Sequence, residues 1–364
     1  MMRCPVHRPS AALVLLPALL YGALTTFATG GACAAETTAH EPHVALILPL
    51  GSPSFGRHAD AVRLGFLAAA KVAGKEAPPI RVYAVNEEAL NVLTIYEQAI
   101  ESGARLVVGP LTRNGVAALA TSNLVTVPTL TLNTIEPRTP QPPRMYLFGL
   151  NIELEARQIA RLAIDDGRRS AFVISDSTPL GKRMRQTFVE EFARLGGDTI
   201  AEFGFGPDQA SLNKLREAAG LGVADMAFLA LDFARARAVR PYLANTLALY
   251  ATSQVNAGNA GALAARDLDL VRFVDMPWLL QADHPAVMVY PRPQFGDAID
   301  LDRLYALGID AFRIGLDLLR RRRDPVLDGV TGRIRLVRNQ QYLRELTAAQ
   351  YLDGKTVILG EPRP

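Results

Sequence analysis

The fold is decided by a short apolar stretch, VALILPL, at residues 44–50. A continuous apolar run of this length is typical of a strand that is buried on both faces of a sheet. The segment that follows, residues 57–71, places its apolar residues at helical spacing. A buried strand followed by an amphipathic helix is the first unit expected of an α/β fold.

The same alternation continues along the chain. We predict further strands at residues 80–85, 106–108, 127–132, 145–148, 171–175, 199–205, 227–231 and 247–251, with helices between most of them. This order gives parallel sheets that are covered by helices on both faces. Two such series, separated by a proline-rich stretch at residues 137–143, predict two lobes. We assign residues 36–149 and 277–330 to lobe one, and residues 150–276 and 331–364 to lobe two.

Length and composition agree with a globular protein. The chain has 364 residues, of which 49% are hydrophobic and 21% are charged. These values allow one large domain or two ordinary ones, each with a substantial apolar core.

The first 35 residues have the features of a secretory signal peptide. Arg3 and Arg8 precede an apolar run at residues 11–27, and small residues follow at residues 28–35. An uncleaved membrane anchor is the alternative, and the small-residue exit disfavours it. We therefore expect residues 1–35 to be removed on export to the periplasm.

Cys33 leaves the kind of terminus open. Ala32 and Ala34 flank it in a cleavage pattern of the A-x-A type, but a lipid could also be attached to this cysteine. Lipoprotein signals usually have Leu three residues before the cysteine, and Gly30 stands there, so soluble release is slightly favoured. A lipid on Cys33 would tether the protein to the outer membrane and is the only membrane contact expected.

The exported part is expected to be nearly neutral and free of disulfides. Removal of Arg3 and Arg8 brings the 39 basic residues close to the 36 acidic ones, and the two cysteines, Cys4 and Cys33, both lie in the signal region. A nearly neutral chain lacks the overall positive charge of a nucleic-acid-binding protein. We predict no nucleic-acid partner.

Patterns for catalysis are missing from the sequence. Its histidines do not occur at zinc-ligand spacing, and it has no G-x-S-x-G motif. Asp297, Asp300, Asp302 and Asp310 form an acidic cluster, which is best explained by acids gathered before and within the first turns of a helix. We therefore predict no metal, no cofactor and no enzymatic activity.

Candidate ligand contacts come from the loops that follow the predicted parallel strands. Such loops carry most ligand contacts in open α/β sheets. Small polar residues in them suit hydrogen bonds to a small polar ligand, but they also serve as turn formers and helix caps, and composition leaves the two explanations about even. The candidates are Ser52, Ser54, Thr112, Asn133 and Ser253.

A run of four arginines ends a long predicted helix at residues 304–323. Arg320, Arg321, Arg322 and Arg323 are favourably placed in a last helical turn, and this is the simpler explanation. The alternative is a contact with anionic lipid or with an acidic partner.

Several segments together resemble one family, the LppC-like penicillin-binding-protein activators. The resemblance covers nearly the whole exported chain, and the segments are LILPLG at residues 46–51, LGFLAA at 64–69, VVGPL at 107–111, VPTLTLN at 127–133, LYATSQ at 249–254, FVDMPWLL at 273–280 and LYALGIDA at 304–311. The resemblance implies the two-lobed type 1 periplasmic-binding fold. It also implies a role as a non-catalytic regulator that binds and activates a bifunctional peptidoglycan synthase.

The chain departs from the best-known members of this family. They carry a helical-repeat domain ahead of the binding-protein domain, whereas here only a few residues separate the signal from the first strand, so we expect that domain to be lacking. A rival function belongs to another class: a solute-binding receptor that delivers an amino acid or a similar small polar ligand to an ABC importer.

Overall fold

The computed structural model describes residues 41–136, 138–206, 209–258, 261–322, 326–337 and 339–360. The expected signal peptide, with Cys33, and the last arginine of the basic run, Arg323, lie outside the described residues. Within the described part of the chain, no helix is both long and apolar enough to cross a membrane.

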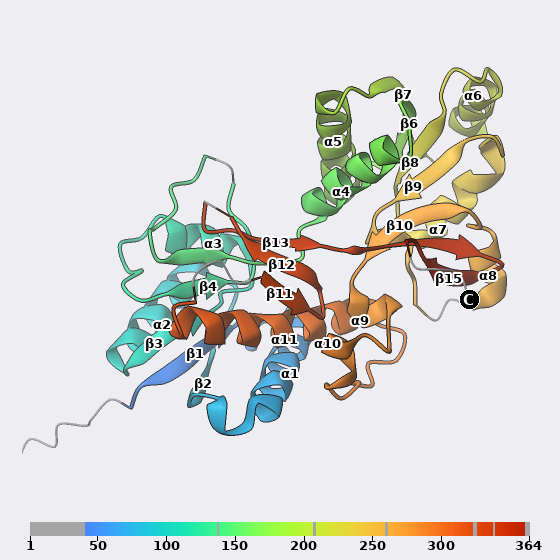
Figure 1. Cartoon of the computed structure of the whole chain (residues 1–364). Coiled ribbons are helices and arrows are strands. Elements are labelled where there is room, and N and C mark those ends of the chain that lie inside the picture. The colour runs from blue at the N-terminus through green and yellow to red at the C-terminus, as the bar shows by residue number, and fades with distance from the viewer. Residues whose placement is uncertain are drawn as a thin grey trace, which may run out of the picture. The chain divides into compact units, whose positions relative to one another are not determined.

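The first large sheet is parallel throughout, with the strand order β2-β1-β3-β4-β5 (Figure 1). Its strands are β1 (His43–Leu48), β2 (Ile80–Ala84), β3 (Ala104–Val108), β4 (Thr129–Thr131) and β5 (Met145–Leu147). One face packs against helices α1 (Gly56–Ala73) and α11 (Ile299–Leu319), and the other packs against α2 (Ala89–Glu101) and α3 (Arg113–Ala120).

Strand β1 is buried on both faces, as its apolar sequence predicts. Leu46 and Leu48 pack in the same cluster as Phe66 of α1 and Phe312 of α11. Ala45 and Ile47 point the other way and pack with α2. Because side chains alternate between the two faces of a strand, only a continuous apolar run satisfies this central position.

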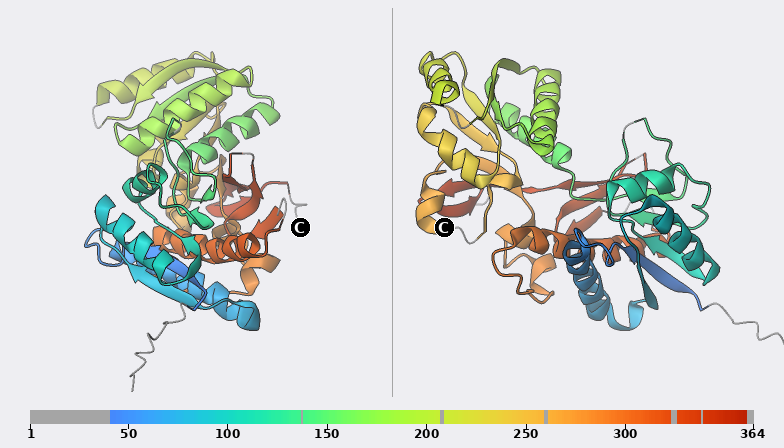
Figure 2. Two further views of the ribbon diagram at one scale, coloured as in Figure 1. Left: turned by 90° about the vertical axis from the view of Figure 1, so that its left-hand side faces the viewer. Right: turned by 180° about the vertical axis from the view of Figure 1, so that it is seen from behind.

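The second large sheet has the order β15-β14-β10-β9-β8-β6-β7 and is parallel except for its two C-terminal strands (Figure 2). Its parallel strands are β6 (Ser170–Ser175), β7 (Asp198–Gly204), β8 (Met226–Ala230), β9 (Ala248–Ala251) and β10 (Val271–Asp275), and its antiparallel strands are β14 (Thr347–Leu352) and β15 (Lys355–Ile358). Its helices are α4 (Ile152–Asp165) and α5 (Pro179–Arg194) on one face, and α6 (Gln209–Gly220), α7 (Phe233–Val239) and α8 (Ala262–Arg266) on the other.

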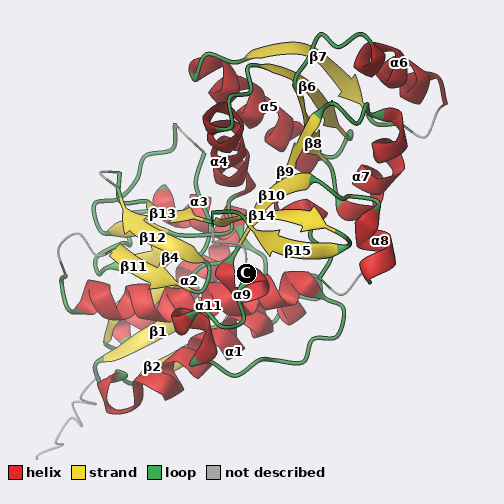
Figure 3. Cartoon of the chain, turned by 45° about the vertical axis from the view of Figure 1, so that its right-hand side comes forward, coloured by secondary structure: helices red, strands yellow, loops and turns green. Residues whose placement is uncertain are grey.

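A small antiparallel sheet lies beside α11 (Figure 3). It consists of β11 (Val326–Gly329), β12 (Gly332–Leu336) and β13 (Tyr342–Glu345), and the short helices α9 (Pro277–Leu280) and α10 (Pro285–Met288) precede it. A bridge pairs Leu147 at the end of β5 with Gln341. Of the described strands that follow α11, only β14 and β15 belong to the seven-stranded sheet. The lobe boundaries given above stay a prediction.

Helices α1 and α11 touch backbone to backbone at two glycines. A Cβ atom on Gly65 would lie 1.9 Å from the carbonyl oxygen of Tyr305, and a Cβ atom on Gly308 would lie 2.1 Å from that of Val62. Real side chains do not tolerate such distances, so either helix would have to shift. The glycines in LGFLAA and LYALGIDA therefore set how closely these two helices pack.

We predict that Gly308→Ala destabilises the protein by about 1–3 kcal/mol, because the added methyl group overpacks the contact between α1 and α11. The matched control is Gly220→Ala at the exposed end of α6, where a Cβ atom meets nothing within 4 Å. Urea unfolding of both variants gives the two free energies. Equal stability of the two variants would contradict the proposed close contact.

Candidate functional site

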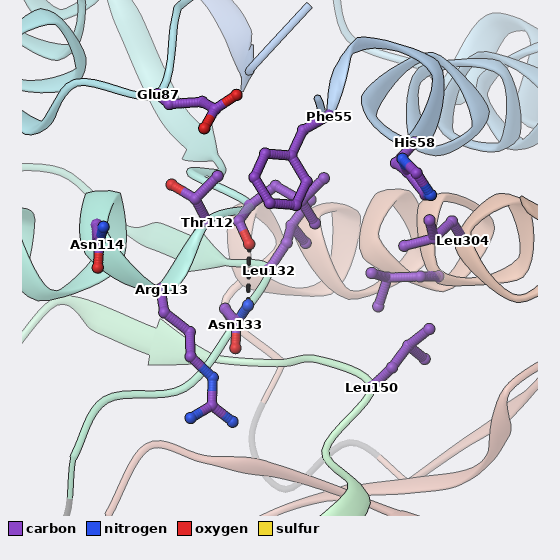
Figure 4. Close-up of a pocket in the computed structure, with 12 residues that line it drawn as sticks. Phe55, His58, Glu87, Thr112, Arg113, Asn114, Leu132, Asn133, Leu150 and Leu304 are labelled. Atoms are coloured by element: carbon purple, nitrogen blue, oxygen red, sulfur yellow. Dashed lines mark hydrogen bonds between the residues drawn. The ribbon is translucent and has the colours of Figure 1, made fainter. Parts of the chain in front are cut away.

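A pocket of about 480 Å³ lies at the carboxyl ends of the parallel strands of the five-stranded sheet. Open α/β sheets bind ligands at this edge. Figure 4 shows its wall, with Glu87, Thr112 and Asn133 along one side and His58, Leu304 and Leu150 along the other. The apolar wall residues are Phe55, Leu111, Leu132, Leu150, Leu304 and Leu307, and the polar ones are His58, Glu87, Thr112, Arg113, Asn114 and Asn133.

Ser52 lies beneath the pocket wall and holds two of its residues in place. Its hydroxyl is buried, donates to the Glu87 carboxylate and accepts the backbone N–H of Phe55 at 2.8 Å. The serine thus holds both the start of α1 and the carboxylate that follows β2. Glu87 reaches the pocket, whereas Ser52 does not line it.

Thr112 and Asn133 line the pocket but already serve the loops that carry them. The Thr112 hydroxyl caps α3 by accepting the backbone N–H of Gly115 at 3.2 Å. The Asn133 amide donates to the carbonyl of Leu111 at 3.0 Å and accepts the N–H of Thr134 at 3.0 Å. Each side chain keeps one further donor for a ligand, since a hydroxyl and an amide NH₂ exceed these needs.

The structure brings together only part of the predicted ligand set. Thr112 and Asn133 lie in the pocket, Ser52 acts on it through Glu87, and Ser54 is exposed and is not among the wall residues. Glu87 also lines the pocket and is not among the predicted residues, although it follows a predicted strand. A search of that strand's end loop for charged residues would have found it.

Charged residues at the rim link α3 with the helices of the second sheet. Arg113 of α3 lies 3.5 Å from the Glu153 carboxylate in α4, and Arg183 of α5 lies 3.2 Å from the same oxygen. Arg113 also approaches Glu136 at 3.9 Å. The Arg113 side chain is 41% exposed, so water and salt weaken these pairs.

The pocket therefore combines an apolar wall with one carboxylate and one guanidinium. Such a wall suits a small ligand that carries an amino group, a carboxylate and an apolar side chain. Among the described residues, no group of three or more His, Cys, Asp and Glu side chains could hold a metal ion.

Ser253, the fifth candidate, lies in a buried ion-pair network. Its carbonyl accepts the Arg303 guanidinium at 2.9 Å, and the same guanidinium donates to the Asp275 carboxylate at 2.9 Å. Asp275 also accepts the Asn256 amide at 2.9 Å and the N–H of Met276 at 2.8 Å. Although burial lowers the pKa of Arg303, the Asp275 carboxylate raises it overall, so the arginine stays charged.

The network continues to Glu155 and Arg344. The N–H of Ser253 donates to Glu155 at 3.2 Å, and the Arg344 guanidinium lies 3.8 Å from the other oxygen of that carboxylate. Burial raises the pKa of Glu155 and lowers the pKa of Arg344. Arg344 also donates to the carbonyl of Gly149 at 3.1 Å. The network thus contacts the chain near each passage between the two large sheets, after β5, after β10 and before β14.

Asp310 departs from the sequence interpretation. The explanation by acids before and within the first turns of a helix does not hold for Asp310, which lies in the interior of α11 and is fully buried. Its carboxylate accepts the N–H of Val330 at 3.1 Å, and the N–H and hydroxyl of Thr331 at 2.7 Å each. These donors compensate for burial, which raises the pKa of Asp310. The residue therefore fastens the β11–β12 turn to α11.

Comparison with known proteins places these features in a family. The sequence matches the family described as "LppC putative lipoprotein" over residues 34–219 and 222–354. A protein named "Penicillin-binding protein activator LpoA" from Pantoea ananatis is 28% identical, and the match covers 76% of this chain and 47% of that protein. The chain spans about half the length of the relatives of this name that it matches.

Solved structures support the fold. A "putative branched-chain amino acid ABC transporter" from Chromobacterium violaceum is 37% identical, with a TM-score of 0.73, and covers 85% of this chain and 100% of that one. The LpoA C-domain from Haemophilus influenzae, described as a regulator of PBP1A, has a TM-score of 0.73 at 24% identity and covers 87% of this chain and 99% of that one. The expected fold, parallel sheets flanked by helices in the periplasmic-binding class, is confirmed.

We predict that Asp275→Asn destabilises the protein by about 3–5 kcal/mol, because it removes the buried charged partner of the Arg303 guanidinium. The matched control is Asp300→Asn. Asp300 also binds Arg303 at 2.9 Å, but its side chain is 73% exposed, so a loss of about 0.5 kcal/mol or less is expected. Urea unfolding measures both, and equal losses would contradict the role of burial.

Proposed function

The chain belongs to the LppC family, and on this premise we propose that it is a non-catalytic regulator of the cell envelope that binds and activates a penicillin-binding protein. The supporting observation is the match to relatives named penicillin-binding protein activators over about three quarters of the chain. The partner that we propose is a bifunctional peptidoglycan synthase in the periplasm. Export would follow the signal at residues 1–35, with an outer-membrane tether if Cys33 carries a lipid.

The side chains of the pocket support a binding role over a catalytic one. The Ser52 hydroxyl is buried and engaged by Glu87, and Thr112 and Asn133 are engaged in the loops that carry them. These hydrogen bonds stabilise the loops around the pocket, and the buried Ser52 hydroxyl does not line it.

A protein that activates its partner by binding must have different affinities for two conformations of that partner. A partner shifts a conformational equilibrium only when it binds one conformation more tightly than the other. We therefore propose that the protein binds the active conformation of the synthase with higher affinity than the inactive one.

A second candidate, the solute-binding receptor, is favoured by a specific observation. The pocket offers Glu87 and Arg113 near an apolar wall, and the Chromobacterium violaceum structure described above carries a transporter name. In this function the pocket would hold an apolar amino acid for delivery to an importer. The two candidates differ in their partner, so they can be tested separately.

The first test is binding to a synthase. We predict saturable binding of the exported chain to a purified bifunctional peptidoglycan synthase from the same cell, measured by surface plasmon resonance. A monofunctional transpeptidase from that cell is the control and should not bind. Failure of every bifunctional synthase to bind would refute the regulator proposal.

The second test addresses the receptor. If the chain is a solute-binding receptor, calorimetry should detect leucine binding to the exported chain. Glu87→Gln should then weaken that binding by about 2 kcal/mol, because it removes a charged hydrogen-bond acceptor. Ser54→Ala, an exposed change outside the pocket wall, should bind leucine normally. If neither leucine nor phenylalanine binds, the receptor candidate fails and the regulator proposal is untouched.

A further inference from the structure

A second pocket lies at the opposite edge of the five-stranded sheet. Its volume is about 510 Å³. Pro128 and Arg144 line it and directly precede β4 and β5, whereas the first pocket is lined by residues that follow strands of the same parallel sheet. The two pockets are therefore separate, with the length of the strands between them.

Arginine and tyrosine dominate this second pocket, which we call the Arg–Tyr pocket. It is defined by Arg144, Tyr146, Asp317, Arg321, Arg322 and Tyr342. They come from the segments before and within β5, the C-terminal end of α11 and the start of β13. Among the described arginines of the four-arginine run, Arg321 and Arg322 line the pocket, whereas Arg320 pairs with Glu76.

Aromatic packing holds the tyrosine side chains of this pocket in place. Tyr342 is buried, its ring lies 6.3 Å from that of Tyr146, and it packs edge-on against Phe148 at 6.4 Å. Burial also raises the pKa of Tyr342, so its hydroxyl stays neutral at any physiological pH. Beside the guanidinium groups, the partly buried Tyr146 ring provides contact area with little loss of side-chain entropy on binding.

Positive charge is in excess in the Arg–Tyr pocket. The Asp317 carboxylate pairs with Arg322 at 3.2 Å, and burial raises the pKa of Asp317. The Arg144 guanidinium donates to the neutral carbonyl of Thr126, and no carboxylate of the described residues forms an ion pair with it. Within the described part of the chain, Arg321 has no ion-pair partner. Three guanidinium groups therefore face one carboxylate.

We propose that the Arg–Tyr pocket binds carboxylate side chains of an acidic segment on the partner synthase. This inference rests on the proposed function and names the surface through which the partner would dock. Guanidinium groups match carboxylates in planar, two-point hydrogen bonds, and Arg and Tyr are, with Trp, enriched at energetically dominant protein contacts. Exposed charges of this kind act mainly on the rate of association and its salt dependence.

The test compares two double variants of the exported full chain. Arg144→Gln with Arg321→Gln removes the two uncompensated charges and retains the Arg322–Asp317 pair. Arg57→Gln with Arg333→Gln removes the same charge from exposed arginines that do not line the Arg–Tyr pocket. Thermal unfolding of both variants identifies any loss of fold.

The first probe is fluorescein-labelled tetraglutamate, followed by anisotropy at low salt, with tetraglutamine as the neutral control. We expect the Arg144/Arg321 variant to bind tetraglutamate roughly tenfold more weakly than the unaltered chain, and the Arg57/Arg333 variant to bind it normally. Equal binding by the two variants would overturn the proposal. Displacement of the peptide by an equimolar amount of inorganic phosphate would also overturn it, because the pocket would then be a small-anion site.

The second probe is the synthase itself. The Arg144/Arg321 variant should associate with it more slowly at low salt and show a weaker salt dependence than the Arg57/Arg333 variant. Identical association of both variants would overturn the docking surface while leaving the proposed function intact. If the unaltered chain does not bind any synthase, the proposed function fails, and with it the assignment of the synthase as partner, whereas the tetraglutamate result still decides whether the pocket binds acidic peptide.

Discussion

The ion pair between Arg303 and Asp275 connects the first turns of α11 to the end of β10, and the passages of the chain between its two large sheets meet around it. Burying two charges costs solvation free energy, which the pair alone does not recover. Here the carbonyl of Ser253 and the amide of Asn256 supply further hydrogen bonds. Glu155 and Arg344 extend the same network. The arrangement of the chain segments that pass between the two large sheets therefore depends on a set of specific polar contacts.

Helix α11, which contains Arg303, packs along one face of the first large sheet. Near its start, Leu304 and Leu307 line the first pocket, and Gly308 fits against the backbone of α1. Asp310 fastens the β11–β12 turn in the middle of the helix, and Arg321 and Arg322 follow its end in the Arg–Tyr pocket. A helix of this length extends about 30 Å, so one rigid element borders both candidate binding sites.

Sequence reasoning predicted the parts of the structure that follow from periodicity. The apolar run of β1 indicated a strand buried on both faces, and the alternation of strands and helices indicated parallel sheets. The family resemblance, carried by such segments as LYALGIDA, is confirmed by the family match. In that segment the roles of Gly308 and Asp310 became clear only from their neighbours, since a glycine contact and a buried carboxylate both depend on residues far away in the sequence.

The candidate site was harder to predict for a related reason. Thr112 and Asn133 could be predicted to lie near each other, because strand-end loops meet at one edge of a parallel sheet, and both line the pocket. Ser253 also follows a strand, but its backbone binds Glu155 and Arg303 in the ion-pair network, and these two residues come from helices far away in the sequence. Glu87 and Arg144 carry no local motif, and only the assembled fold places them in pockets.

We propose that this chain regulates a peptidoglycan synthase by binding to it. The most direct measurement is the rate of glycan polymerisation by a purified bifunctional synthase as the exported chain is added. We predict that the rate rises and reaches a plateau at the concentration at which the two proteins are fully bound. An unchanged rate while the two proteins are fully bound would contradict it.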